Sequence, residues 1–394
     1  MPVNRRAFLR ITGISALPLV APFIPALGAD DKKFPLPPAP ARAVSFTGDS
    51  LMYTSAEYIN KLQEINATKP IERDSYGNGG AVAALEKKFT EVTGKEKAIF
   101  MPSGTMANQL AILVLSGENT KVFVQETSHV YRDEADAAQS VHNKRLIPVA
   151  QGKTGFTADE LQQAVDYHRQ GEVFASGMGV VSIENPVRRA DGRFIPFDEL
   201  KKISAYCRKE GFKMHLDGAR IHMASAWSGV SIAEYSSLFD TVYISLYKYL
   251  GAAAGAILCG DKAVIDKMNH LMKIHGGAMY SNWANAAMAL HHLDGMETRM
   301  KQARDRGEEL IAQLNKLGGI KISPLESGTN IYEMKIEKGV DIMKFGTALA
   351  KEHNISIRRP NAKGTAQFMI NESILSQDVS TMTNAFKSAL QSAK

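Results

Sequence analysis

One lysine of this chain stands alone in a loop where an uncharged amine would be reactive. Residues 241–260 contain a β-branched and aromatic run, a glycine- and alanine-rich loop and a second apolar run, which together predict strand, loop and strand. Lys248 lies between Tyr247 and Tyr249 in this loop. Burial disfavours the ammonium form of lysine and favours a nucleophilic amine, which suits covalent bonding to an aldehyde. The alternative interpretation is that Lys248 is a surface lysine in an ordinary turn, because such a lysine has the same local pattern.

The motif His215-Leu-Asp217-Gly-Ala-Arg220 places a carboxylate and a guanidinium at the end of a predicted strand, shortly before Lys248. A buried carboxylate there can hold a protonated pyridine nitrogen by a charge-assisted hydrogen bond. The protonated ring then becomes an electron sink. The plainer alternatives are that Asp217 closes an Asp-Gly turn and that Arg220 pairs with a surface acid.

A third motif, Ser103-Gly104-Thr105, lies between a strand predicted for residues 98–101 and a helix predicted for residues 109–115. The start of a helix offers free backbone N–H groups and the positive end of the helix dipole, and both favour a bound phosphate. A capped helix without a ligand would have a similar sequence.

Taken together, these motifs predict a site for pyridoxal 5'-phosphate, whose aldehyde, ring nitrogen and phosphate need these three kinds of partner. His129 is expected to stack on the ring unless it only caps a helix, and Ser245 is expected near the phosphate. We expect no metal, because Cys207 and Cys259 match no metal-ligand spacing. The two cysteines form either one disulfide or two core thiols, and the second fits their apolar surroundings better.

Strand and helix patterns alternate from about residue 98 to residue 260, which predicts an α/β fold with a mainly parallel sheet covered on both faces. Ligands gather at the carboxyl ends of such strands. Long helix patterns follow at 261–273 and 282–317. We expect a large domain over residues 45–296, including an N-terminal arm, and a small α+β domain over residues 297–394.

The N-terminal residues have the pattern of an export signal. Residues 4–10 contain a twin-arginine pattern, and an apolar run over residues 11–27 is followed by a small-residue site near Ala29. This predicts a Tat signal over residues 1–29, then a proline-rich lead-in over 30–44, and hence a periplasmic protein without a membrane anchor. The alternative, a transmembrane anchor, is disfavoured because glycine and prolines interrupt a short run.

Composition agrees with a soluble enzyme. Of 394 residues, 44% are hydrophobic and 22% charged. The net charge of +6 includes three arginines of the predicted signal, so it indicates no nucleic-acid partner.

From about Ser45 onward the chain resembles the low-specificity threonine aldolases, members of the β-eliminating lyase group of fold-type-I pyridoxal phosphate enzymes. The resemblance is carried by residues 74–77, 98–108, 183–185, 215–221, 276–279 and Lys248. It implies a mainly parallel seven-stranded sheet, a small C-terminal α+β domain and a homotetramer built as a dimer of dimers.

The resemblance also implies roles for single residues. Lys248 would bind the cofactor covalently and His129 would stack on it, as the two catalytic residues. The other implied cofactor contacts are Gly104, Thr105, Asp217, Arg220 and, across a subunit boundary, Lys273. The local motifs add Ser103 and Ser245 as predicted cofactor contacts. The implied substrate contacts are Asp49, Ser50, Tyr76 and Arg220, and we predict Arg358 as a further one.

The sequence departs from the family's pattern where the substrate would bind. Val187 stands where the family has a histidine, Tyr247 where it has a serine, and Tyr280 where it has an arginine. The arginine that clamps the substrate carboxylate has no counterpart in residues 366–371, and Arg358 or Arg359 is a candidate substitute.

The predicted reaction is cleavage of the Cα–Cβ bond of a β-hydroxy-α-amino acid, such as threonine, to glycine and an aldehyde. Two alternatives stay open. One is another reaction on the same cofactor, namely β-elimination, racemisation or amino transfer. The other is a protein that binds the cofactor without catalysis.

Overall fold

The structure is a computed structural model that describes residues 43–49 and 53–394. The predicted signal over residues 1–29, nearly all of the predicted lead-in and the predicted substrate contact Ser50 lie outside the described residues.

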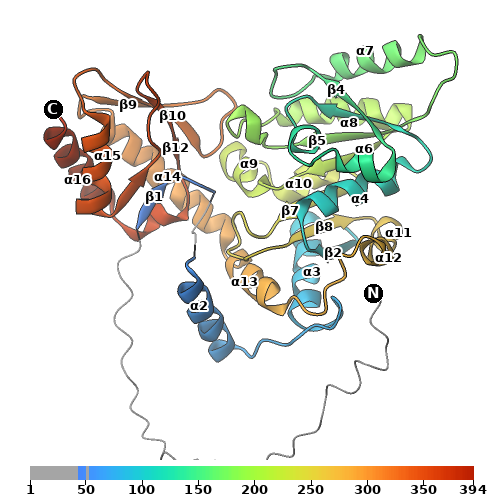
Figure 1. Ribbon diagram of the computed structural model, residues 1–394, viewed down its shortest axis with the longest axis horizontal. Coiled ribbons are helices and arrows are strands. Elements are labelled where there is room, and N and C mark those ends of the chain that lie inside the picture. Colours follow the sequence, from blue (N-terminus) through green and yellow to red (C-terminus); the bar gives the residue numbers. More distant parts are fainter. Residues whose placement is uncertain (1–42, 50–52) are drawn as a thin grey trace, which may run out of the picture. The chain divides into compact units, whose positions relative to one another are not determined.

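A seven-stranded sheet forms the centre of the larger part of the chain (Figure 1). Its strands, in spatial order, are β2 (Lys97–Met101), β8 (Ala256–Gly260), β7 (Thr241–Ser245), β6 (Lys213–Asp217), β5 (Met178–Glu184), β3 (Lys121–Gln125) and β4 (Arg145–Val149). All neighbouring pairs are parallel except the two that involve β8. The predicted α/β fold with a mainly parallel, seven-stranded sheet is therefore confirmed.

Helices cover both faces of this sheet, because alternate residues of a strand point to opposite sides. In β2, Phe100 packs into one core with α3 (Gly80–Thr93), whereas Ile99 and Met101 pack into another with α4 (Gly104–Ser116). The remaining helices of this part are α2 (Ser55–Thr68), α5 (His129–Arg132), α6 (Ala137–His142), α7 (Ala158–Arg169), the 3-10 turn η1 (Arg188–Ala190), α8 (Phe197–Glu210), α9 (Ile221–Ser228), α10 (Ile232–Ser237), α11 (Lys262–Ile265), α12 (Met268–Ile274) and α13 (Trp283–Leu293).

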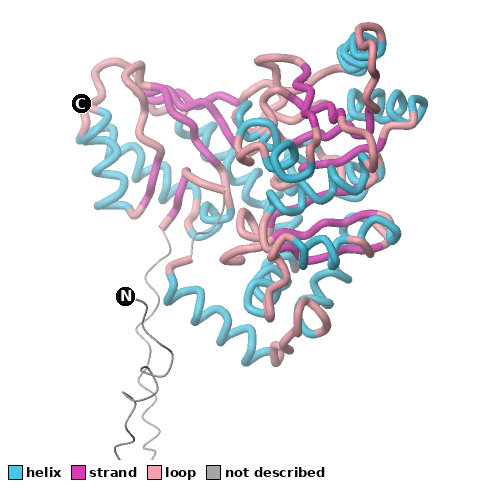
Figure 2. Tube along the Cα trace, turned by 45° about the vertical axis from the view of Figure 1, so that its right-hand side comes forward, coloured by secondary structure: helices cyan, strands magenta, loops and turns pink. Residues whose placement is uncertain are grey.

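A separate hydrophobic core belongs to the C-terminal residues. Three antiparallel strands, β9 (Ile320–Pro324), β10 (Ile331–Ile336) and β12 (Thr365–Met369), pack there against α14 (Met296–Leu314), α15 (Ile342–His353) and α16 (Val379–Ser392), with the 3-10 turn η2 (Glu372–Ser376) beside them. The short β1 (Val44–Phe46) joins the same core by pairing in parallel with β11 (Ile355–Ile357). The coloured trace in Figure 2 shows these strands beside their helices.

Two expected helices are each divided in the structure. The pattern over residues 282–317 forms α13 and α14, separated at Asp294 and Gly295. Gly295 has φ of +65°, in the left-handed region that ends a helix, and glycine adopts it without a steric cost. Residues 261–273 likewise form α11 and α12 instead of one helix. Apolar spacing continued through both breaks, so periodicity alone did not reveal them.

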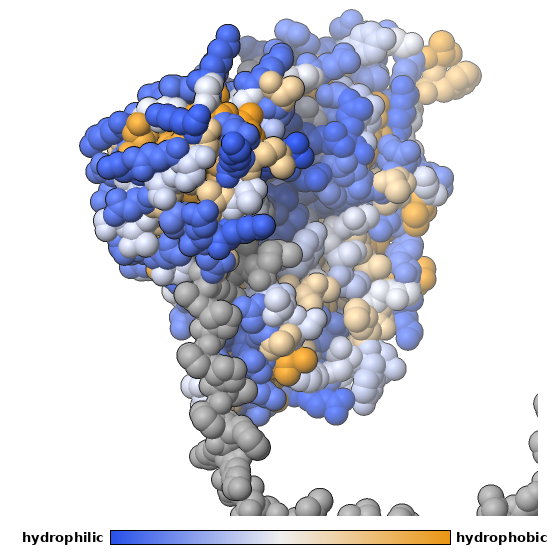
Figure 3. Space-filling model, turned by 60° about the vertical axis from the view of Figure 1, so that its left-hand side comes forward, coloured by the Kyte–Doolittle hydropathy of each residue, from blue (hydrophilic) through white to orange (hydrophobic). Residues whose placement is uncertain are grey.

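Both cysteines are free and buried, as core thiols would be. On the face drawn in Figure 3, hydrophilic side chains predominate and hydrophobic ones are scattered. Within residues 43–49 and 53–394, no helix combines the length and the apolar character needed to span a membrane.

Candidate active site

A cavity of about 230 Å³ lies at the carboxyl edge of the seven-stranded sheet. The loops after β2, β3, β6 and β7 contribute to it, because parallel strands deliver their carboxyl ends to one edge. Seven residues predicted from the sequence line this cavity together: Ser103, Gly104, Thr105, His129, Asp217, Arg220 and Lys248.

Lys248 is nearly buried, with 9% of its surface exposed, and its Nζ lies 5.6 Å from the centroid of the Tyr247 ring. Burial, reinforced by the positive charge of Arg220, lowers the pKa of Lys248 to about 8. The lowered pKa increases the fraction of the amine that is uncharged near neutral pH and can act as a nucleophile.

This lowered pKa gives a testable pH dependence. Only the neutral amine reacts with acetic anhydride, so acetylation of Lys248 in the cofactor-free protein should rise with pH around a midpoint of about 8 instead of 10.5. Peptide mass spectrometry measures it. Arg220→Gln should raise the midpoint because it removes a positive charge, whereas Arg145→Gln, at an exposed position on β4, should leave it unchanged. A midpoint near 10.5 in the wild type would contradict the assignment.

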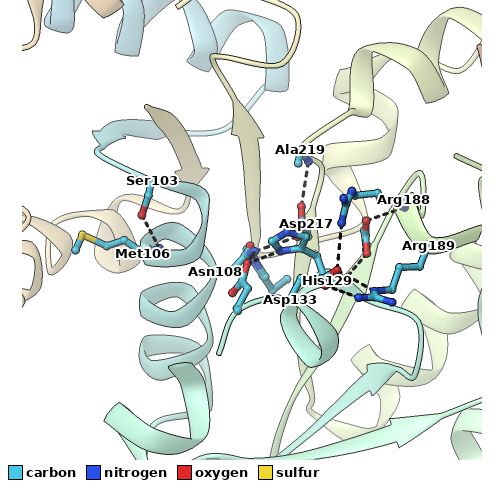
Figure 4. A network of polar contacts seen from close by, with 12 residues as sticks. Ser103, Met106, Asn108, His129, Asp133, Arg188, Arg189, Asp217 and Ala219 are labelled. Atoms are coloured by element: carbon cyan, nitrogen blue, oxygen red, sulfur yellow. Dashed lines mark hydrogen bonds and ion pairs between the residues drawn. The ribbon is translucent and has the colours of Figure 1, made fainter. Parts of the chain in front are cut away.

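Asp217 is 2% exposed at the end of β6, and both of its carboxylate oxygens accept hydrogen bonds. The Ala219 N–H donates to Oδ1 at 3.1 Å, and the Asn108 side-chain amide donates to Oδ2 at 3.0 Å (Figure 4). The same amide donates to Oε1 of Glu134 at 2.8 Å. Asn108 therefore bridges two buried carboxylates and fixes the position of Asp217.

A neutral histidine orients this amide. Burial lowers the pKa of His215 to about 4, so the ring carries a single N–H. Its Nε2 lies 2.9 Å from Oδ1 of Asn108, which can only accept, and its Nδ1 lies 2.8 Å from the Thr241 hydroxyl. The proton must therefore be on Nε2, and the hydroxyl donates to Nδ1. In this arrangement, the amide nitrogen of Asn108 is directed at Asp217.

His129 is held from two sides at the start of α5. Its Nδ1 lies 2.9 Å from Oε1 of Glu134, and its backbone N–H donates to Oε2 of Glu184 at 2.7 Å. The hydrogen bond to Glu134 raises the pKa of His129 in spite of partial burial. Burial and the nearby charge of Asp217 raise the pKa of Glu184 to about 7. The ring of His129 therefore has a fixed orientation on the cavity wall.

The first turn of α4 also lines the cavity. Ser103 is the N-cap, and its Oγ accepts a hydrogen bond from the Met106 N–H at 3.2 Å. The N–H groups of Gly104 and Thr105 stay available for a ligand at a helix start, where an anion is favoured. A Cβ on Gly104 would lie 2.0 Å from Oη of Tyr243, so the close approach requires glycine.

Arg220 lines the cavity and binds Asp49 bidentately, with Nε–Oδ1 and Nη2–Oδ2 distances of 2.9 Å each. The Tyr249 hydroxyl also donates to Asp49 at 3.2 Å. Burial alone would raise the pKa of Asp49, but Arg220 outweighs it and the pKa is lowered. Asp49 lies in a neighbouring cavity of about 530 Å³ that Arg220 also lines, together with Arg358.

Three other predicted residues do not line the first cavity. Ser245 is buried at the end of β7. Tyr76 is 53% exposed, its ring centroid lies 5.4 Å from that of Tyr280, and Lys273 Nζ lies 5.5 Å from the Tyr76 ring. The sequence patterns indicated no role for Asn108, His215 or Glu134. The first two lie within quoted motifs, but nothing local indicated that they meet.

The cavity fits a phosphorylated pyridine aldehyde. The helix start supplies N–H donors for a phosphate, Asp217 supplies a fixed buried acceptor for a ring N–H, and Lys248 supplies a partly neutral amine for an aldehyde. These are the three partners that pyridoxal phosphate needs.

The sequence matches the β-eliminating lyase family over residues 54–337. It is 34% identical over 257 residues to the low-specificity L-threonine aldolase of Candida albicans, an alignment that covers 64% of this chain and 68% of that protein. The low specificity L-threonine aldolase of Escherichia coli (strain K12) is 28% identical over 258 residues, covering 65% of this chain and 76% of that protein.

Solved structures agree in fold. A crystal structure from Exiguobacterium sp. 255-15, provisionally described as an aromatic amino acid β-eliminating lyase/threonine aldolase, has a TM-score of 0.74 and 27% identity over 89% of this chain and 98% of that chain. The threonine aldolase of Leishmania major has a TM-score of 0.67 at 19% identity, over 89% of this chain and all of that chain, and shows the fold alone. The family predicted from the motifs is confirmed, and the chain belongs to the β-eliminating lyases.

Proposed function

We propose that this protein is a pyridoxal-phosphate-dependent lyase that cleaves the Cα–Cβ bond of β-hydroxy-α-amino acids such as threonine to glycine and an aldehyde. The observation that carries the proposal is the meeting of Lys248, Asp217 and the first turn of α4 around one cavity. The relatives named as threonine aldolases favour this reaction over others of the same cofactor.

The residues that line the cavity would have different roles in cofactor binding and catalysis. Gly104 and Thr105 would hold the phosphate, Lys248 would hold the cofactor covalently, and His129 would face the ring. Asp217, fixed by Asn108, would keep a proton on the ring nitrogen. When bound, pyridoxal phosphate supplies an electron sink for the electron pair of the broken Cα–Cβ bond.

Cleavage also requires a base, because the β-hydroxyl loses its proton as the carbonyl of the aldehyde forms. We assign this task to His129, directly or through water. With Nδ1 held by Glu134, its Nε2 is the ring nitrogen left to accept a proton. The raised pKa of His129 means that the neutral, proton-accepting form increases as pH rises through that value.

The substrate α-carboxylate needs a cation, and we assign Arg358 to it. The corresponding family arginine is replaced here by a segment on β12, where Gln367 contacts the Arg358 guanidinium. Arg358 and Gln367 line the cavity next to Arg220, so the positive charge has moved from β12 to the residue after β11.

The same departures favour a second candidate, β-elimination from serine or cysteine. Val187 and Tyr247 replace polar family residues near the reacting atoms, which would weaken control of a β-hydroxyl. A colorimetric assay on the reconstituted enzyme separates the two. We expect acetaldehyde and glycine from threonine. Pyruvate from serine, without aldehyde from any β-hydroxy amino acid, would overturn the aldolase proposal.

We further propose export by the Tat pathway to the periplasm and assembly as a homotetramer. The twin-arginine pattern of residues 4–10 supports export. None of the residues of α2 is buried within this chain, and Ile59 on it is 56% exposed, which supports packing against another subunit. The exposed Tyr76 and Lys273 would then reach a neighbouring subunit's site.

A further inference from the structure

The cavity next to the active site is lined by more basic than acidic side chains. It measures about 530 Å³ and shares Arg220 with the first cavity, so the two spaces adjoin at that guanidinium. Among the described residues that line it, four are arginines and one, Asp49, is acidic: Arg188, Arg189, Arg220 and Arg358. A cavity wall with this excess of one charge attracts an anion.

Two of these arginines are already neutralised. Asp49 binds Arg220 through both carboxylate oxygens, and Asp133 binds Arg189 in the same bidentate manner, with a 2.9 Å bond from Nε and a 2.5 Å bond from Nη2. These pairs show that the local geometry accepts carboxylates. The positive charge of the cavity that is not neutralised in this way therefore comes from the other two arginines, Arg188 and Arg358.

The charge of Arg188 is only partly neutralised, because the carboxylate that it contacts also binds Arg189. Its Nη1 lies 3.3 Å from Oδ2 of Asp133, the oxygen that Arg189 Nε also contacts (Figure 4). The Arg188 side chain is 53% exposed, and guanidinium has five N–H donors, so several of them can reach a ligand in the cavity. Among the described residues, the side chain that hydrogen-bonds Arg358 is the neutral amide of Gln367.

The two incompletely neutralised arginines come from different elements. Arg188 begins η1, four residues after Glu184 at the end of β5, and its backbone N–H donates to that carboxylate at 2.9 Å. Arg358 follows β11 in the C-terminal part. Glu184 also holds His129, so Arg188 is tied to the side of the site where we place the proton acceptor of the β-hydroxyl. A substrate with two carboxylates would place one at each of these two arginines.

We propose that the preferred substrates are β-hydroxy-α-amino acids with a second carboxylate on the side chain, and that Arg188 binds that carboxylate. This inference rests on the proposed function. The simplest such substrate is 3-hydroxyaspartate. Its Cα–Cβ bond breaks, the β-hydroxyl loses its proton and becomes the carbonyl of glyoxylate, and Cα gains a proton to give glycine. The atoms balance without an oxidant or a further reactant.

The first test compares kcat/KM for 3-hydroxyaspartate and threonine on the reconstituted enzyme. We expect the wild type to prefer 3-hydroxyaspartate. Arg188→Gln should lose about 10- to 100-fold more activity toward 3-hydroxyaspartate than toward threonine, because a charge-assisted hydrogen bond is removed for one substrate only. Arg188→Lys should restore part of the preference. Arg145→Gln, an exposed arginine on β4, is the matched control and should change neither value.

A binding measurement separates failure of this inference from failure of the proposed function. Succinate and butyrate differ by one carboxylate, and calorimetry on the reconstituted protein should show tighter binding of succinate, weakened by Arg188→Gln. Threonine cleavage without preference for 3-hydroxyaspartate would overturn the inference and leave the function intact. If neither amino acid is cleaved, selective succinate binding that depends on Arg188 still supports the second carboxylate site, and equal binding of both acids overturns it.

Discussion

Replacing Lys248 by alanine should abolish the reaction, with a loss on the order of 10⁴-fold or more, because none of the other described residues that line the cavity can supply the amine. The described residues lining the cavity include one lysine, and the other cation there, Arg220, does not lose its proton. Turnover of threonine and the visible absorbance of the reconstituted protein should disappear together.

The controls for this prediction use neighbouring positions. Lys248→Arg keeps the positive charge but not a neutral amine, so it should be as inactive as Lys248→Ala. Tyr247→Phe keeps the aromatic ring beside the amine and should retain the visible absorbance. Unchanged circular dichroism establishes that the inactive variants are folded. Residual turnover above 10% of the wild type in Lys248→Ala would show that the assignment is wrong.

Replacing Asp217 by alanine should have the second largest effect, a loss in kcat of about 10²- to 10³-fold, by analogy with the removal of one fixed polar group from a catalytic site. The carboxylate is what would keep the ring nitrogen protonated, and it is already positioned by Asn108 and the Ala219 N–H. Initial rates at saturating substrate and cofactor measure it.

Asp217→Asn sharpens the experiment because it preserves the shape and removes the negative charge. It should resemble Asp217→Ala in rate, and Asp217→Glu should recover part of it. If Asp217→Asn retained full activity, a charged partner for the ring nitrogen would be unnecessary. Asp166→Asn, on α7 with 44% of its side chain exposed, is the matched control and should leave kcat unchanged.

The sequence predicted those parts of the site that have a local pattern. Lys248, Asp217 and the Ser103 to Thr105 turn each end or follow a β-strand, and parallel strands bring such positions to one edge. Their meeting therefore followed from the fold class. His129 and Arg220 also follow predicted strands, but each had a plain structural alternative, a helix cap and a surface ion pair, and the family resemblance favoured the role at the cofactor.

The polar network behind the site needed the structure. Asn108 meets Asp217 across 109 residues, and Arg220 meets Asp49 across 171 residues. No periodicity or motif encodes such pairs, because they depend on the order of strands in the sheet and on the path of the N-terminal segment. The breaks in the helices at Gly295 and near Lys267 were also missed, since a backbone turn leaves the apolar spacing unchanged.

The short strand β1 connects the C-terminal core to the ion pair between Asp49 and Arg220. Phe46 is buried in that core, where its ring stacks on Phe368 at a centroid distance of 4.1 Å. Three residues later, Asp49 holds the guanidinium of Arg220. The residue that holds Arg220 therefore lies three residues along the backbone from the C-terminal core. Because Arg358 follows β11, the strand that pairs with β1, the positions of Arg220 and Arg358 both depend on the same pair of strands.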